Sequence, residues 1–361
     1  MENNNLENGN TEIKHKRRKR YSGTHPVKFK DKYKELNPDK YPNAITHAIE
    51  KGNTPAGMHI SIFVKEILNI LKINHGEVGL DCTLGYGGHS ERMLEALEGE
   101  GHLFSIDIDP IEIQKTTKRL RDKGFSEEIL TTKLINFANI EEVAKEEIVN
   151  KSGGFDFVLA DLGVSSMQID NPERGFTFKK DGPLDLRMNP KQGITAAERL
   201  KDISKEELEG MLIENADEPF AAEIANAIKE YQRKGNTIET TIDLKNIIEE
   251  ALKIVQKSER EEAVKKSSQR VFQAIRIDIN HEYESLYNLL EHLPKVLKSG
   301  GRVVILTFHS GEDRLVKKSF KAHLKSGDYK EVSKDAIRPS KEECKMNPRA
   351  RTTKLRWAIK E

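Results

Sequence analysis

Apolar and polar positions follow two different rhythms along the chain. Six short apolar runs predict buried strands, at residues 78–83, 102–107, 131–136, 155–161, 302–307 and 354–359. A helical pattern begins near Met58, and apolar residues also recur at helical spacing between the first four runs. Continuous apolar strands that alternate with helices are typical of a parallel sheet covered on both faces. The pattern therefore predicts an α/β fold.

The alternation stops after the fourth predicted strand. Residues 165–193 are rich in Gly, Pro, Asp and Asn and predict a long structured loop. Helical patterns follow at 219–231 and 241–255 with no strand between them, and one long helix is expected from about Arg270 to near Ser299. A sheet interrupted by a helical insertion of roughly domain size explains this order.

The expected organisation has three parts. They are a basic, partly disordered N-terminal extension at 1–57, a sheet-forming core at 58–170 and 266–361, and an inserted helical domain at 171–265.

Charge is unevenly distributed along the chain. The chain has 60 Lys and Arg against 59 Asp and Glu, so its net charge of +1 gives no argument for nucleic-acid binding. However, six of the seven residues from Lys14 to Arg20 are basic, and residues 338–361 also carry an excess of basic side chains. Each basic segment predicts either a solvated tail or a contact with a polyanion.

Two classes of protein are excluded by composition. No apolar run approaches the ~18 residues of a membrane span. Cys82 and Cys344 are too few for a disulfide framework or a zinc site built on thiolates. We therefore expect a cytoplasmic protein that contains no metal.

A glycine-rich segment, Asp81 to Ser90, lies between the first predicted strand and its helix. Open α/β sheets bind ligands at the carboxyl ends of their strands, and glycines let the backbone approach a ligand closely. Asp107 closes the second strand, where a carboxylate can accept both ribose hydroxyls of a nucleoside. A dinucleotide fingerprint would require glycine at Ser90, so S-adenosylmethionine fits this pattern better. Phe137 follows the third strand and could stack on adenine.

Several irregular segments resemble the ribosomal RNA small-subunit methyltransferase H family, also called MraW. They run in collinear order from about His59 to the C-terminus: Gly87–Ser90, Asp161–Ser166, Asp170–Phe176, Asp181–Asp185, Phe272–Ile277, Phe308–Ser310 with Glu312–Arg314, and Asn347–Arg351. The N-terminal extension resembles a second group within this family, found beside the standard enzyme in some bacteria.

The resemblance implies a function and a fold. Members use S-adenosylmethionine to methylate the exocyclic N4 of a cytidine in the decoding region of small-subunit rRNA, in the bacterial cytoplasm. Their fold is a Rossmann-like class I methyltransferase core with an inserted helical domain. The family's cofactor contacts carry over to Gly87, Gly88, His89, Asp107, Phe137, Asp161 and Gln168.

The residues that would hold the target base are less clearly marked. Many base-amino methyltransferases place an Asp/Asn-Pro-Pro-aromatic motif after the fourth strand, but here Asp161 is followed by Leu-Gly-Val. Phe176 or Phe178 could therefore stack on the base instead. The candidate catalytic residues are Asp185 as acceptor of an N4 hydrogen, Arg187 for a flanking phosphate and His309 facing the base. Alternatively, Asp185 and Arg187 only tie down a loop and His309 only caps a turn.

Two other functions remain open from the sequence. One is a non-catalytic rRNA-binding or ribosome-assembly factor, although it would have no need to keep Gly87, Asp107, Asp161 and Gln168. The other is a methyltransferase of DNA, another nucleic acid or protein, and the absent Pro-Pro-aromatic motif weakens the DNA option. In the favoured interpretation the partner is small-subunit rRNA or the small ribosomal subunit, and residues 347–351 contact its phosphates together with Lys14–Arg20.

Overall fold

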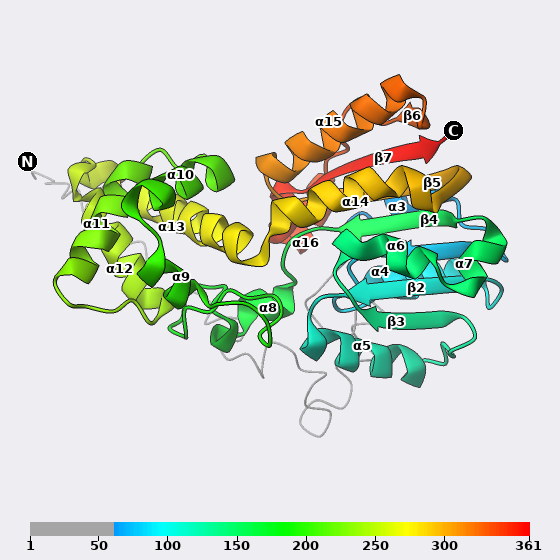
Figure 1. Cartoon of the computed structure of the whole chain (residues 1–361), viewed down its shortest axis with the longest axis horizontal. Coiled ribbons are helices and arrows are strands. Elements are labelled where there is room, and N and C mark those ends of the chain that lie inside the picture. Colours follow the sequence, from blue (N-terminus) through cyan, green and yellow to red (C-terminus); the bar gives the residue numbers. More distant parts are fainter. Residues whose placement is uncertain (1–60) are drawn as a thin grey trace, which may run out of the picture.

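The computed structural model describes residues 61–361 (Figure 1). The predicted N-terminal extension at 1–57, with its basic run Lys14–Arg20, lies outside the described residues. Within them, a seven-stranded sheet stands beside a separate group of helices, and helices α13 (Lys257–Asn280) and α14 (Glu282–Val296) lead from this group to the sheet.

The sheet has the strand order β3-β2-β1-β4-β5-β7-β6. The strands are β1 Val78–Asp81, β2 His102–Asp107, β3 Leu130–Leu134, β4 Phe155–Asp161, β5 Leu297–Thr307, β6 Tyr329–Val332 and β7 Lys354–Lys360. The neighbouring pairs among β1 to β5 are parallel, whereas β7 pairs antiparallel with both β5 and β6. This arrangement confirms the predicted α/β fold with a Rossmann-like core. The short strand β6 was not predicted.

Helices cover both faces of the sheet. Along β4, Val158 and Ala160 belong to one buried apolar cluster, and Phe157 and Leu159 belong to another on the opposite face. The helices that flank the sheet are α3 Val64–Leu71, α4 Gly88–Leu97, α5 Pro110–Asp122, α6 Ile140–Ala144, α7 Glu147–Ser152, α14 Glu282–Val296 and α15 Ser310–Ser326. Alternating side chains therefore bury the strand on both sides, as the continuous apolar runs predict.

The helical insertion has an apolar core of its own. Its helices are α9 Ala196–Asp202, α10 Lys205–Ala216, α11 Ala221–Arg233, α12 Thr241–Ala251 and α13 Lys257–Asn280. Val271, Phe272 and Ile275 of α13 pack within this core. The expected boundary at 265/266 therefore falls inside α13, and the chain returns to the sheet only at α14.

The prediction of one long helix from Arg270 to Ser299 is wrong. Helix α13 already begins at Lys257 and ends at Asn280, and α14 begins at Glu282. His281 between them adopts the left-handed conformation, with φ of 51°. The apolar spacing continues across this break and no glycine or proline marks it, which is why the sequence pattern concealed the joint.

The strand register brings functional side chains to one edge. Asp81 at the end of β1 aligns with Ser105 of β2 and with Leu159 of β4. Asp107 and Asp161 therefore lie two residues beyond the end of β1, beside the glycine-rich turn. None of the helices in residues 61–361 combines the length and the apolar character needed to cross a membrane.

Candidate active site

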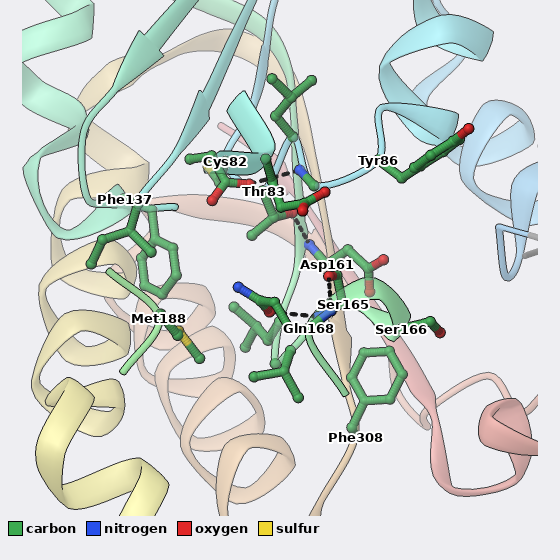
Figure 2. Close-up of a pocket in the computed structure, with 18 of the residues that line it drawn as sticks. Cys82, Thr83, Tyr86, Phe137, Asp161, Ser165, Ser166, Gln168, Met188 and Phe308 are labelled. Carbon is green, nitrogen blue, oxygen red and sulfur yellow. Dashed lines mark hydrogen bonds between the residues drawn. The ribbon is translucent and has the colours of Figure 1, made fainter. Parts of the chain in front are cut away.

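A cavity of about 400 Å³ opens at the carboxyl ends of β1, β2 and β4 (Figure 2). All the predicted cofactor residues line it, namely Gly87, Gly88, His89, Asp107, Phe137, Asp161 and Gln168. Asp185, Arg187 and His309 are not among its lining residues. The cavity therefore unites the residues from the strand ends but not the three catalytic candidates.

The backbone conformation of the turn between β1 and α4 is fixed by its contacts with Thr116 of α5. Gly87 has φ of 79°, and a Cβ atom there would lie 2.6 Å from Cγ2 of Thr116. The Thr116 hydroxyl donates to the carbonyl of Gly85 at 2.6 Å. Glycine is required at 87 because both the backbone conformation and the space exclude a side chain.

Asp107 is held at the cavity by two backbone amides. Its carboxylate oxygens accept hydrogen bonds from the amides of Gly85 at 2.7 Å and Asp109 at 2.8 Å. Burial raises the pKa of Asp107 to about 6, although both amide hydrogen bonds oppose this rise. The carboxylate is therefore oriented in advance and loses its charge only in mildly acidic solution.

Asp161 and His89 leave buried polar atoms without partners. Oδ1 of Asp161 and Nε2 of His89 make no hydrogen bond within the described part of the chain. Nε2 of His89 lies 3.6 Å from Oδ2 of Asp161, while the Asp161 amide donates to the Thr83 hydroxyl at 2.7 Å. Buried polar atoms are normally hydrogen-bonded. The carboxylate therefore fits a ligand that brings a hydrogen-bond donor, such as an ammonium group.

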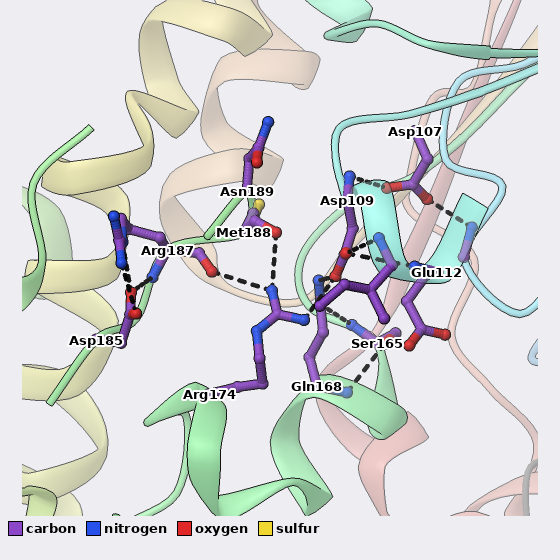
Figure 3. Close-up of polar contacts among 12 residues, drawn as sticks. Asp107, Asp109, Glu112, Ser165, Gln168, Arg174, Asp185, Arg187, Met188 and Asn189 are labelled. Atoms are coloured by element: carbon purple, nitrogen blue, oxygen red, sulfur yellow. Dashed lines mark hydrogen bonds and ion pairs between the residues drawn. The ribbon is translucent and has the colours of Figure 1, made fainter. Parts of the chain in front are cut away.

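Gln168 is positioned by a polar network that sequence reasoning missed (Figure 3). Its side-chain amide donates to Oδ2 of Asp109 at 2.9 Å, and Nη1 of Arg174 donates to the same oxygen at 2.8 Å. Arg174 also donates to the carbonyl of Met188 at 2.8 Å. Buried Asp109 thus joins the end of β2, α8 (Ser166–Asp170) and the loop around Met188. Its one sequence signal is its place before Pro110, where it caps α5.

Aromatic side chains occupy two different environments. Phe137 lies just after β3 at the start of a short 3₁₀ turn and lines the cavity, as does Phe308, which was not predicted as a site residue. Phe176 and Phe178, the candidates for stacking on the target base, do not line the cavity, and this role stays a prediction. Both pack against the insertion's core, with the Phe178 ring 5.3 Å from that of Phe272, because the loop folds back onto the helices.

Asp185 and Arg187 bind each other within their loop (Figure 3). The guanidinium donates to both carboxylate oxygens, at 2.7 and 2.8 Å, and to the carbonyl of Gly193 at 3.2 Å. His309 caps α15, with Nδ1 accepting from the Glu312 amide at 3.5 Å. These contacts match the alternative roles, in which Asp185 and Arg187 hold a loop together and His309 caps a turn. The catalytic roles of the three residues stay predictions.

Charged residues from three helices also line the cavity, although sequence reasoning did not name them as site residues. They are Arg276 of α13, Glu282 of α14 and Glu312 of α15. Burial alone would raise the pKa of Glu312, but His309, the Phe308 amide and Arg276 outweigh it and lower the pKa. Two of the three lie in the motifs Phe272–Ile277 and Glu312–Arg314. Nothing in their spacing indicates that they meet.

The C-terminal motif reaches the same cavity. Asn347 and Arg349 are among its lining residues, and Arg349 pairs with Asp170 at the end of α8 at 2.7 Å. A basic side chain therefore stands at the cavity beside a carboxylate, where it can face an incoming anionic ligand.

Comparisons with known proteins agree in one family. The sequence profile of the MraW methylase family matches residues 56–361. "Ribosomal RNA small subunit methyltransferase H 1" of Agathobacter rectalis is 62% identical over 349 residues, which cover 97% of this chain and 99% of that protein. "Ribosomal RNA small subunit methyltransferase H 2" of Alkaliphilus metalliredigens is 59% identical, with 97% and 99% covered.

Other matches are more distant. The methyltransferase H of Halothermothrix orenii is 38% identical and covers 83% of this chain and 97% of its own. A solved S-adenosylmethionine-dependent O-methyltransferase of Thermotoga maritima covers 84% of this chain and 72% of its own, with 12% identity and a TM-score of 0.35. The 97% matches must include most of residues 1–57, which confirms the predicted likeness to the extended group. The chain therefore belongs to the MraW methylase family.

Proposed function

We propose that this protein uses S-adenosylmethionine to methylate the exocyclic N4 of a cytidine in the decoding region of small-subunit rRNA. The observation that carries the proposal is the cavity at the strand ends, where Asp161 keeps a buried carboxylate oxygen unpaired. The names of the two most similar relatives described above support rRNA as the substrate class. The motif resemblance supports the choice of N4.

The lining residues fit S-adenosylmethionine. Asp161 and His89 would hold its amino-acid part, because a carboxylate pairs strongly with an ammonium group. Asp107 would accept hydrogen bonds from the ribose hydroxyls, and Phe137 would stack on adenine. When bound, this cofactor supplies an electrophilic methyl group on a positively charged sulfur.

The chain's own contribution is alignment and electrostatics. The N4 lone pair of cytosine is delocalised into the ring, so the amine is a weak nucleophile. A cavity that fixes both partners and faces the amine with carboxylates lowers the barrier without a covalent intermediate. Asp185, Arg187 and His309 have weaker support as participants, because none of them lines the cavity.

The proposed partner is small-subunit rRNA in a bacterial cytoplasm. Arg349 at the cavity would contact phosphate, and the basic run Lys14–Arg20, outside the described residues, would add to this contact. The salt dependence of binding to small ribosomal subunits tests both contributions. Its slope becomes shallower with each phosphate that a variant no longer neutralises.

Two measurements test the function. Titration calorimetry with S-adenosylmethionine should give a clear binding heat, and mass spectrometry of rRNA nucleosides should show N4-methylcytidine depleted in cells that lack the gene. Binding without any rRNA change would overturn the substrate. An absent binding heat would overturn the enzyme and favour a non-catalytic rRNA-binding factor.

A further inference from the structure

The proposed function leaves one wall of the cavity without a role. Arg276, Glu282 and Glu312 line this wall, and the exposed fractions of their side chains are only 14%, 11% and 4%. Removing ions from water costs several kcal/mol each, and a hydrophobic wall would be as stable or more stable. Ionised groups at a ligand cavity therefore point to a ligand that needs them.

The pair Arg276–Glu282 presents a donor beside an acceptor. Nε and Nη2 of Arg276 donate to Oε1 and Oε2 of Glu282 at 2.7 and 2.8 Å. Nη1 makes no hydrogen bond to the described residues, and each carboxylate oxygen can accept a second one. Arg276 lies near the end of α13 and Glu282 at the start of α14, with His281 between the two helices. Figure 1 shows that this joint lies between the insertion and the sheet.

Two carboxylates stabilise the charge of Arg276. Burial alone would lower the pKa of Arg276, but Glu282 and Glu312 outweigh it, and the pKa is raised. Glu312 adds a second carboxylate close to Glu282, so this wall carries two acidic side chains and one arginine.

The local contacts favour an organic ligand over a metal ion. Ligand atoms of Glu282, His309 and Glu312 lie within 4.8 Å of one another, a spacing that could hold a cation. However, Nδ1 of His309 faces the Glu312 amide at 3.5 Å, and Nε2 lies 3.2 Å from Oε1 of Glu312. A metal would need the lone pair of Nε2 and would face the charge of Arg276.

The wall's donor and acceptor match one pyrimidine edge. Cytosine offers an amine donor at N4 next to an acceptor at N3, whereas uracil offers an acceptor at O4 next to a donor at N3. Carboxylates accept from cytosine N4, and arginine donates to base acceptors. Uracil would meet like groups at both positions.

Resting on the proposed function, we propose that Arg276 and Glu282 recognise the target cytosine. Glu282 accepts one hydrogen of the N4 amine, and Nη1 of Arg276 donates to N3. This contact holds the amine by one hydrogen in the base plane and leaves its lone pair free to meet the methyl group. Glu312, which lines the same cavity close to Glu282, stabilises positive charge as it develops at N4.

The test compares two transcripts of small-subunit rRNA that differ only at the methylated position, which mass spectrometry of the wild-type product locates. Binding is measured with S-adenosylhomocysteine present at saturation. For the wild-type protein, the transcript with uridine there should bind at least about 5-fold more weakly than the transcript with cytidine, since good base contacts discriminate by ~1–3 kcal/mol.

Two variants remove the recognition. Arg276→Met/Glu282→Gln removes both charges of the pair, while Glu312 keeps its contacts with His309 and the Phe308 amide. This double variant should bind both transcripts within about 2-fold of each other. Glu282→Gln alone keeps the side-chain length and should also lose most of the discrimination. Both variants should keep S-adenosylmethionine affinity within about 3-fold, which also shows that they fold.

The matched control is a second arginine–carboxylate pair far from the cavity. Arg302 donates to Glu77 at 2.7 and 3.0 Å, and the exposed fractions of these side chains are 13% and 14%. Arg302→Met/Glu77→Gln should lower stability but keep the cytidine-to-uridine ratio of the wild type.

The outcomes separate the two proposals. A double variant at Arg276 and Glu282 that keeps the wild-type ratio would overturn the recognition, and so would a wild-type ratio near one in a protein that methylates cytidine. A wild-type protein that methylates no cytidine at all would instead overturn the proposed function.

Discussion

The two ends of the parallel sheet hold the same kinds of residue in opposite states. At the amino end, Glu77 is paired with Arg302, and Asp156 accepts from the Val78 amide at 2.9 Å and pairs with Lys298. At the carboxyl end, an oxygen of Asp161 and a nitrogen of His89 have no partner in the described chain. The charged groups named at the amino end are paired within the protein, whereas these two polar atoms at the carboxyl end are free to bind a ligand.

This difference indicates how to recognise a site in a sheet of this kind. Burial and side-chain charge are similar at both ends, so neither identifies the site. What distinguishes the carboxyl end is hydrogen-bonding capacity that the protein itself does not use. Variants at the two ends should therefore affect different measurements, ligand affinity at one and unfolding at the other.

The largest effect is expected from Gly87→Ala at the carboxyl end. Alanine at 87 would have to adopt the left-handed backbone conformation, and its Cβ would lie 2.6 Å from Cγ2 of Thr116. We expect the backbone strain and the steric clash together to cost about 3 kcal/mol. Calorimetry should show S-adenosylmethionine affinity reduced about 100-fold. Gly193→Ala is the matched control: φ is 72° there but nothing lies within 4 Å, so affinity should not change. Equal losses in both variants would contradict the steric argument.

The next effect compares two aspartates of the same strand. Asp161→Asn removes the negative charge that would face the ligand's ammonium group, and S-adenosylmethionine should bind about 10- to 100-fold more weakly, as for a charged hydrogen bond of ~1.5–3 kcal/mol. Asp156→Asn, at the other end of β4, should lower the unfolding midpoint in urea with affinity unchanged. An Asp161→Asn protein with normal affinity would break the comparison.

A smaller effect should appear with pH at Asp107. Its pKa of about 6 means that the free protein protonates this carboxylate in mild acid, whereas the ribose hydroxyls need the ionised form. Affinity should therefore be constant above pH 7 and fall about 10-fold by pH 5. Near pH 6, binding should release protons, which calorimetry in buffers of different ionisation enthalpy detects. An affinity that stays flat down to pH 5 would exclude Asp107 from the contact.

The smallest effect is expected at Asp185. Asp185→Asn breaks the pair with Arg187 inside the loop, and such pairs contribute at most ~1 kcal/mol. Methylation should fall less than about 3-fold, with cofactor affinity unchanged. A loss of 100-fold or more in turnover would restore Asp185 as a catalytic residue and show that the loop moves toward the cavity.

The candidate cofactor residues at the carboxyl edge of the sheet were predictable because each is marked by its own short stretch of sequence. Gly87, Asp107 and Asp161 each lie at or just after the end of a strand, and parallel strands bring their ends to one edge. The burial of both faces followed from the same apolar runs. Sequence periodicity was sufficient here because each strand's position fixes the residues at its end.

The cavity wall formed by Arg276, Glu282 and Glu312 was not predictable, because no short stretch of sequence indicates that these residues meet. Arg276 and Glu282 meet only because His281 adopts a left-handed conformation that no glycine signals. The contact between Asp109 and Arg174 likewise joins segments 65 residues apart. Asp185 and Arg187 were chosen for their residue types, but the loop turns them toward each other. Pairings of this kind depend on tertiary packing and leave no periodic signal.

The joint at His281 also makes the proposed recognition of the base depend on the position of the helical insertion. Arg276 belongs to the insertion's last helix and Glu282 to α14, which returns to the sheet, so their ion pair connects these two parts of the molecule. A second ion pair, between Asp217 and Arg314, connects them as well. Any change in the angle between α13 and α14 would therefore alter the contact between Arg276 and Glu282. Binding of a large substrate to the helical insertion would then affect the geometry of Arg276 and Glu282, the two residues that we propose to contact the base.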